Sequence, residues 1–173
     1  MALRSGPFSV AEARSCGVSR GHLRGPSYHR LGAGLYRWAG LDENPDLLLR
    51  AVARRLPPGA AFSGWTAAWL HGLDVKPCEP IEVTIPDPLS GGHRAGTSVR
   101  RGTLAPAEIV IRRHVPATSA LRTVADLGAR DPLTEAVVAA DLFLHARLVT
   151  VTHLHAYVAD HPEIGRASCR ERV

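Results

Sequence analysis

The pattern of apolar and polar positions over residues 1–40 predicts two short helices followed by a β-hairpin. Ser9 and Glu12 match a capping box, in which each side chain accepts a hydrogen bond from a backbone N–H of the other residue. The helix that they open should end at Gly17, because glycine readily adopts the left-handed conformation that stops a helix. A second short helix is predicted over residues 19–24.

Two strand-like segments, residues 28–31 and 35–38, flank a glycine-rich turn and are typical of a β-hairpin. Helix, tight turn, helix and basic hairpin is the order of a winged helix-turn-helix. We therefore predict that residues 1–40 form a small winged helix-turn-helix module. Only eight residues precede Ser9, which leaves little room for the first helix of a three-helix core. Either the start codon is misplaced or a helix at residues 45–56 completes that core.

The rest of the chain, residues 44–163, predicts a mixed domain of about three strands and five helices. Apolar residues recur at helical spacing in five stretches, at residues 45–56, 63–70, 118–128, 133–146 and 149–158. Alternating apolar and polar residues predict three strands, at residues 81–85, 97–101 and 108–113, with a Gly/Pro-rich loop over residues 86–96. The predicted fold class is α+β.

Composition limits the function classes. A hydrophobic content of 45% over 173 residues is enough for a packed core. No apolar run is long enough to cross a bilayer and no signal peptide precedes residue 8, so a cytoplasmic protein without a membrane partner is expected. Three widely spaced cysteines form neither a disulfide framework nor a zinc motif. A single lysine among 21 basic residues, with abundant alanine, suggests a GC-rich bacterial source.

Positive charge is concentrated at the amino-terminal end. Residues 1–40 contain six arginines and one acidic residue, Glu12, for a net charge of +5, which equals the formal charge of the whole chain. Residues 41–163 contain 12 basic and 14 acidic groups, and residues 164–173 add a net +2. A basic cluster confined to one predicted module favours a nucleic-acid partner.

The last ten residues, 164–173, are expected to be foreign to the protein. They resemble the translation of a common short-read sequencing adapter, and such segments are excluded from fold reasoning. On this interpretation the native product continues beyond Glu163 and the chain is an amino-terminal fragment.

Catalytic and metal motifs are absent from the sequence pattern. Asp87 and Glu108 have a spacing that invites a Mg²⁺ nuclease site, but the position two after Glu108 is Val110 rather than lysine. His153 and His155 lie two apart on a predicted helix, so they point in different directions. We therefore predict no catalytic residue, no metal and no cofactor, and we do not expect an enzyme.

Seven residues are the candidates for DNA binding: Arg14, Ser19, Arg20, His22, Arg24, Arg30 and Arg37. The second helix, which Ser19 opens, should present its basic residues to the major groove. The hairpin arginines should contact phosphates or an adjacent minor groove, and Arg14 should contact a backbone phosphate. Tyr36 and Trp38 are assigned to hairpin packing. Because the second helix is short and contains Gly21, specific binding should require a homodimer or a second contact.

Several short stretches together resemble one bacterial family. They are residues 7–13, 17–26, 30–36, 57–63, 66–73, 82–86 and 117–127. The chain resembles the AbiEi-type antitoxins of type IV toxin–antitoxin systems. It also resembles the amino-terminal part of actinobacterial proteins that end in an endonuclease domain similar to very-short-patch repair enzymes. The resemblance spans roughly residues 6–160, depends on the order of many weak matches, and would end where a nuclease domain begins.

Two main hypotheses follow. The first is a bacterial DNA-binding protein that contacts double-stranded DNA. By resemblance it is an antitoxin-like regulator with a cognate toxin, or the targeting half of a truncated endonuclease-like protein. The second is an interaction module in which residues 44–163 bind a protein partner, such as a toxin to be neutralised, and the basic hairpin only supports the fold. A complete enzyme ranks below both. Salt separates the first two, because arginine–phosphate contacts weaken steeply as salt rises.

Overall fold

The computed structural model describes residues 2–32, 34–77, 79–87, 96–162 and 164. These residues form a mixed α+β fold with six α-helices and two sheets, one three-stranded and antiparallel, the other five-stranded and mixed. The predicted α+β class is therefore confirmed. The tail expected to be foreign lies outside the described residues, apart from Ile164.

Residues 2–40, which we call the amino-terminal module, contain one sheet and three short helical segments. In chain order these are η1 (Ala2–Arg4), β1 (Phe8–Ser9), α1 (Val10–Ser15), η2 (His22–Arg24), β2 (Tyr28–Gly32) and β3 (Leu35–Trp38). The strand order is β1-β3-β2, with both neighbouring pairs antiparallel. A small core of Phe8, Ala13 and Leu23 holds the module together, and Leu3 from η1 packs against it. The few residues before Ser9, which leave little room for a first helix, thus contain one turn of 3₁₀-helix, η1.

The predicted capping box is confirmed, whereas the predicted second helix is mostly wrong. The Ser9 N–H donates to the Glu12 carboxylate at 2.6 Å, and the Glu12 N–H donates to the Ser9 hydroxyl at 3.2 Å. Residues 19–24 form only one turn of 3₁₀-helix, η2. Gly21 disfavours helix and Gly25 is extended ahead of a proline, so the segment is too short to accumulate α-helical hydrogen bonds.

The remainder of the chain contains five of the six helices. Its elements are α2 (Pro45–Ala53), β4 (Ala61–Phe62), α3 (Gly64–Leu70), β5 (Ile81–Ile85), β6 (Thr97–Arg101), η3 (Pro106–Glu108), β7 (Ile109–Arg112), β8 (Val115–Thr118), α4 (Ala120–Arg130), α5 (Leu133–His145) and α6 (Val151–Asp160). The sheet order is β6-β5-β4-β8-β7. β5 and β6 are parallel, as are β4 and β8, and the other two pairs are antiparallel.

The five helices expected here are found, but about three strands were predicted and the described residues contain five. β4 has only two residues, too few for an alternating pattern. The segment predicted as one strand over residues 108–113 belongs to a hairpin of β7 and β8, which turns at Arg113 and His114. Both turn residues have positive φ, 47° and 68°, as a two-residue hairpin turn requires, but without the Asn-Gly signature.

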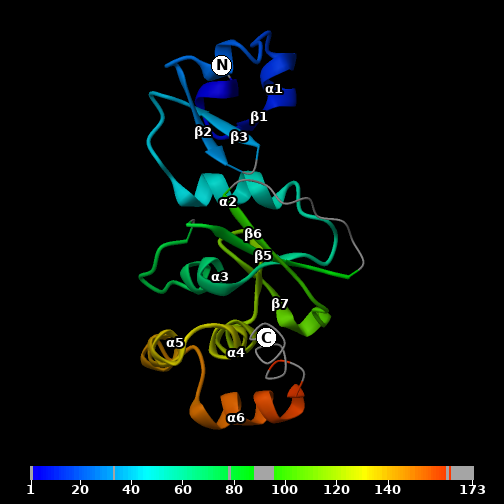
Figure 1. Cartoon of the computed structure of the whole chain (residues 1–173), viewed down its shortest axis with the longest axis vertical. Helices are drawn as coiled ribbons and strands as arrows, with labels where there is room; N and C mark the ends of the chain where they lie inside the picture. Colours follow the sequence, from blue (N-terminus) through cyan, green and yellow to red (C-terminus); the bar gives the residue numbers. More distant parts are fainter. Residues whose placement is uncertain (1, 33, 78, 88–95, 163, 165–173) are drawn as a thin grey trace.

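The elements stack along the long axis of the molecule (Figure 1). Helix α2 lies between the amino-terminal module and the five-stranded sheet, while α4, α5 and α6 gather at the opposite end. The larger core joins α2, the sheet and α3, and it also takes in Leu35 from β3, which is 1% exposed. A second cluster, centred on Phe143 of α5 and Leu127 of α4, packs the helical end. None of the helices in the described residues is long and apolar enough to cross a membrane.

Candidate nucleic-acid interface

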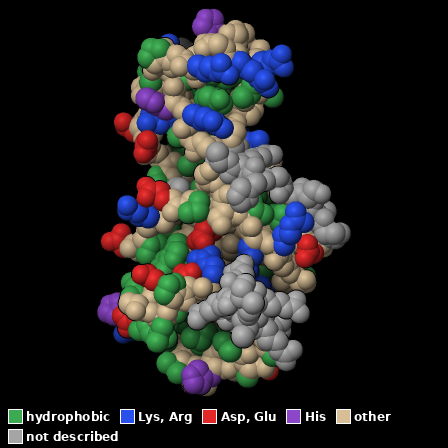
Figure 2. Space-filling view, viewed as in Figure 1, with side chains coloured by type: hydrophobic (Ala, Val, Ile, Leu, Met, Phe, Trp, Pro, Cys, Tyr) green, Lys and Arg blue, Asp and Glu red, His purple; other side chains and the backbone are tan. Residues whose placement is uncertain are grey.

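A hollow of about 600 Å³, the basic groove, opens on the amino-terminal module between the η2 turn and the hairpin. Arg20 and Arg24 line it from the side of the η2 turn, and Arg30 lines it from β2. The remaining lining is mainly apolar or aromatic and consists of Val10, Leu23, Tyr28, Gly34 and Tyr36. In the space-filling view, basic side chains cross this end of the molecule next to hydrophobic ones (Figure 2).

The local structure explains why these three arginines converge. Leu23, 3% exposed, anchors the η2 turn in the module's core, so Arg20 and Arg24 remain at the surface. In the hairpin, Arg30 lies opposite Tyr36 in the strand register. Side chains alternate along a strand, so residues 28 and 30 share one face with residue 36 of the partner strand.

The three groove arginines are available to a ligand. Each is exposed, and none of the three guanidinium groups forms a hydrogen bond or ion pair with another residue in the described part of the chain. Three uncompensated guanidinium groups around one hollow create a local positive potential that attracts phosphate oxygens. The aromatic lining adds flat surfaces against which a sugar or base can pack.

Arg37, also predicted to bind DNA, is used inside the protein. It lies opposite His29 in the hairpin register, hence on the other face from Arg30. Its guanidinium donates to the Leu41 carbonyl and to the Glu43 carboxylate at 3.1 Å, and its side chain is only 13% exposed. The structure therefore assigns Arg37 to the connection between β3 and α2.

The other three predicted residues lie outside the lining of the basic groove. Arg14 is exposed on α1, and His22 is exposed on η2. The Ser19 hydroxyl accepts the His22 N–H at 3.3 Å and lies 3.3 Å from the His22 ring Nδ1, so it stabilises the turn. The structure thus brings together three of the seven predicted residues, Arg20, Arg24 and Arg30.

The tyrosines of the groove were not predicted as part of the interface. Tyr36 stacks on Phe8 with ring centroids 6.5 Å apart, and Tyr28 meets Phe8 edge-on at 5.7 Å. Tyr36 therefore packs against β1 in the core of the module, and it also lines the groove. Trp38 lies under the guanidinium of Arg4, 4.9 Å from the ring centroid. Only the hairpin register, which the sequence did not define, could have identified Tyr28.

Ionisable groups at the opposite end of the molecule are paired with each other. Arg122, 8% exposed, contacts Glu108 at 3.0 Å and Asp126 at 2.8 Å, and the Tyr157 hydroxyl donates to Glu108. Burial opposes ionisation of Glu108, but hydrogen bonds from Tyr157 and the Ala105 N–H and the contact with Arg122 outweigh it and lower its pKa. Burial raises the pKa of Tyr157, and the hydrogen bond to the Glu108 carboxylate acts in the same direction. These groups form a buried structural network, in which the second Asp126 oxygen, Oδ1, has no hydrogen-bond partner among the described residues but lies 3.3 Å from Arg100 Nη1.

The acidic pair considered for a nuclease site is divided between two environments. Asp87 is exposed and lies 3.8 Å from Arg101, whereas Glu108 is held in the buried network. No group of three or more histidine, cysteine or acidic side chains in the described residues is arranged to hold a metal ion.

The geometry defines a class: a mixed α+β protein that combines a small basic three-stranded module with a five-stranded sheet and a helical end. A solved structure with a similar fold is that of the RV2827C protein from Mycobacterium tuberculosis. The two share 17% sequence identity with a TM-score of 0.58, over 94% of this chain and 69% of that one. No protein-family model matches the chain, and no curated protein matches it.

Proposed function

We propose that the chain binds double-stranded DNA through the basic groove of its amino-terminal module. The observation that carries this proposal is the convergence of Arg20, Arg24 and Arg30, exposed and without ion-pair partners among the described residues, around an aromatic hollow. The order of elements supports it. A winged helix has the same order of elements: a helical segment, a strand, two further helical segments and a hairpin. Its sheet also has the order found here, β1-β3-β2.

The electrostatics of the module favour a phosphate backbone over a neutral ligand. Its formal charge is +5, and its single carboxylate, Glu12, is held in the capping box. Phosphate contacts supply affinity and fix register, whereas sequence is read through base edges. The η2 turn is the element best placed to reach base edges, but it is short. The resemblance to antitoxins suggests an autoregulator as the biological setting, and the resemblance to endonuclease-like proteins suggests a targeting module.

The test is the salt dependence of duplex binding, measured by fluorescence anisotropy with a labelled DNA duplex between about 50 and 200 mM salt. Each lost phosphate contact should reduce the slope of log affinity against log salt by about 0.9. The Arg20→Ala/Arg24→Ala/Arg30→Ala variant should therefore lose about two to three from the slope and bind at least about tenfold more weakly. A control variant, Lys76→Ala/Arg147→Gln, removes two charges outside the module and should behave as wild type. Equal slopes for the triple variant and wild type would contradict the proposal.

A protein partner for residues 44–163 is the second candidate function, and one observation favours it. Helices α5 and α6 expose large apolar side chains, led by Leu133 at 81% and followed by Val137, Val151, Val138 and Val158. Leu133 and Val137 lie four residues apart on one helix face, while Phe143 and Ala139 bury the other face. An apolar partner, a toxin by resemblance, would remain bound at high salt, unlike DNA. Sedimentation of the purified chain tests for the homodimer that short recognition elements would require, and a monomer would leave this apolar face available to a different protein.

A further inference from the structure

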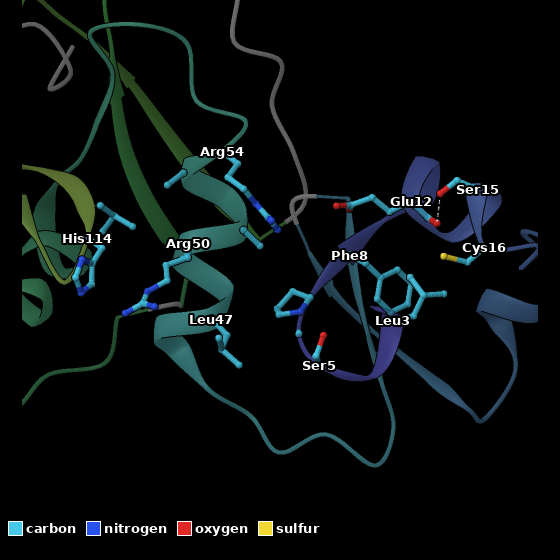
Figure 3. Close-up of a pocket in the computed structure, with 15 residues that line it drawn as sticks. Leu3, Ser5, Phe8, Glu12, Ser15, Cys16, Leu47, Arg50, Arg54 and His114 are labelled. Carbon is cyan, nitrogen blue, oxygen red and sulfur yellow. Dashed lines mark hydrogen bonds between the residues drawn. The ribbon is translucent and has the colours of Figure 1, made fainter. Parts of the chain in front are cut away.

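A second hollow, of about 850 Å³, separates the amino-terminal module from helix α2, and we call it the α2 cleft (Figure 3). One wall comes from η1, β1 and α1 and the other mainly from α2, with two residues of the β7–β8 hairpin at the edge. Its charged and ionisable lining includes Glu12 of α1, Arg50 and Arg54 from the α2 side, and His114 of the hairpin. It is not used by the proposed function.

Helix α2 presents two arginines to this cleft. Arg50 and Arg54 are one turn apart and exposed, whereas Leu49 and Val52 on the same helix are buried in the larger core. Figure 3 shows the Arg54 side chain extending toward the module and the Arg50 side chain extending toward His114. Neither arginine forms an ion pair with another described residue. The buried side of α2 therefore fixes two unpaired cations at the surface.

The carboxyl end of α2 lies beside the turn of the hairpin. Gly34 lines the basic groove, and a Cβ added to it would lie 3.5 Å from the Arg55 guanidinium at the carboxyl end of α2. On the other side, the charges of Arg54 and Arg55 act on Glu12 of α1. The carboxyl end of α2 thus adjoins both the hairpin turn, at Gly34, and helix α1, at Glu12.

We propose that Arg50 and Arg54 form a second set of DNA-phosphate contacts, so that the duplex lies against both the basic groove and α2. This inference rests on the proposed function and extends it beyond the amino-terminal module. One 3₁₀ turn offers few groups to a DNA groove, so register must be fixed by additional contacts. A rigid helix with two cations one turn apart supplies such contacts within the same chain.

Glu12 limits this surface on the module side. It is the only acidic residue among those that line the cleft. The hydrogen bond from the Ser9 N–H, followed by that from the Ser9 hydroxyl, lowers the pKa of Glu12 despite some burial, and Arg54 and Arg55 act in the same direction. Its carboxylate is therefore ionised at neutral pH and repels a phosphate. Glu12→Gln removes that charge and keeps a side chain that fits the capping box.

The experiment compares salt slopes of duplex binding for wild type, Arg50→Ala/Arg54→Ala, Arg50→Lys/Arg54→Lys and the control Lys76→Ala/Arg147→Gln. The alanine pair should lower the slope by about two and weaken binding about tenfold, while the lysine pair should keep most of the slope because it keeps both charges. Glu12→Gln should strengthen binding about two- to threefold and steepen the slope. Circular dichroism melts of each variant establish that it is folded.

The outcomes distinguish this inference from the proposed function. If wild type shows no salt-dependent duplex binding, the proposed function fails and this inference fails with it. If Arg20→Ala/Arg24→Ala reduces the slope but Arg50→Ala/Arg54→Ala does not, the proposed function stands and the contact with α2 is overturned. Weaker binding in the alanine pair together with equal weakening in the control pair would also overturn it, because the effect would then follow total charge.

Discussion

The two ends of the molecule use arginine in opposite ways. In the amino-terminal module, Arg20 and Arg24 are exposed and form no ion pair with another described residue. At the helical end, Arg122 is 8% exposed and contacts two carboxylates, from Glu108 and Asp126. A buried charge is tolerated only when it is paired, whereas an exposed unpaired charge remains available to a partner. Burial and pairing together separate arginines that support the fold from arginines that can bind.

The largest expected effect is on the buried network. Glu108→Ala leaves the Arg122 guanidinium with only part of its compensation and removes the acceptor of Tyr157, so the free energy of unfolding should fall by about 3–5 kcal/mol. Urea unfolding followed by circular dichroism measures this loss. Glu135→Ala, at an exposed position on α5, is the control and should change stability by less than about 0.5 kcal/mol. A loss below about 1 kcal/mol for Glu108→Ala would break the comparison.

The Glu82 carboxylate, which packs against Gly64, provides a second test of a carboxylate held within the fold. Gly64 has φ of 55°, and a Cβ there would overlap the Glu82 carboxylate, which accepts the Trp65 N–H. Gly64→Ala should therefore combine left-handed strain with displacement of Glu82 and lower stability by about 2–3 kcal/mol. Gly72→Ala has the strain (φ 98°) without a neighbouring atom within 4 Å and should cost only about 1 kcal/mol. Equal decreases in the free energy of unfolding for the two variants, measured by the same urea titrations, would show that the Glu82 side chain moves aside at no cost.

Acid should weaken the sheet and helical end through His71. Burial lowers its pKa, and the neutral ring suits its partners, since Nε2 lies 2.8 Å from the Thr118 carbonyl and Nδ1 lies 3.3 Å from the Arg112 Nε. Because the folded pKa lies below the unfolded one, this contribution is complete above about pH 6.5 and is lost as pH falls through the folded value. One proton limits the slope to about 1.4 kcal/mol per pH unit.

Urea midpoints at pH 8, 6.5 and 5 measure this dependence, and His71→Asn should flatten it. The lowered pKa of Glu108 acts with the same sign at lower pH, since its contribution is lost as pH falls below about 4.5. If the urea midpoint of His71→Asn depends on pH as that of wild type does, His71 is not the cause of the loss of stability in acid.

Within the amino-terminal module, the capping box should be worth less than the buried network. Ser9→Ala removes the acceptor for the Glu12 N–H and should lower stability by about 1 kcal/mol. Ser9→Asp should restore most of the loss, because aspartate also caps helices. Thermal melts of the three proteins provide the comparison, and a Ser9→Asp variant no more stable than Ser9→Ala would argue against the cap.

The smallest expected effect sharpens the comparison most directly. Arg20→Ala/Arg24→Ala removes two exposed side chains and should change the free energy of unfolding by less than about 0.5 kcal/mol. The same variant should reduce duplex binding and its salt slope. A stability loss above about 1 kcal/mol would mean that these arginines support the fold, and the contrast with Arg122 would disappear.

The sequence predicted what local patterns determine. The capping box at Ser9 and Glu12, the five later helices and the strand β5 all depend on neighbouring residues. The alternation in β5 predicts one buried face, which is wrong, because Glu82 and Thr84 on the other face are buried as well. It did not predict the β7–β8 hairpin, because the turn at Arg113 and His114 has positive φ without glycine or asparagine. The helix predicted over residues 19–24 is longer than the one observed, because Gly21 lies within the segment and Gly25 and Pro26 follow it directly.

The candidate site was predicted only in part, for a reason of register. Arg30 precedes the hairpin turn and Arg37 follows it, and only the strand pairing shows that they lie on opposite faces of the hairpin. Arg122 and Asp126 lie four residues apart on α4 and pair at 2.8 Å, as helical spacing favours, but the other carboxylate that contacts Arg122, that of Glu108, comes from a distant segment. The α2 arginines lie outside the module that charge counting defined, so composition alone could not connect them to it.

Leu35 has a consequence for anyone who would transplant the amino-terminal module. Its strand belongs to the small sheet, but its side chain is buried with Leu49 of α2 and Phe62 of β4. A cassette cut at residue 40 would present this leucine to water and lose the helix against which the hairpin rests. A portable unit would have to retain α2, and it would then carry Arg50 and Arg54 with it.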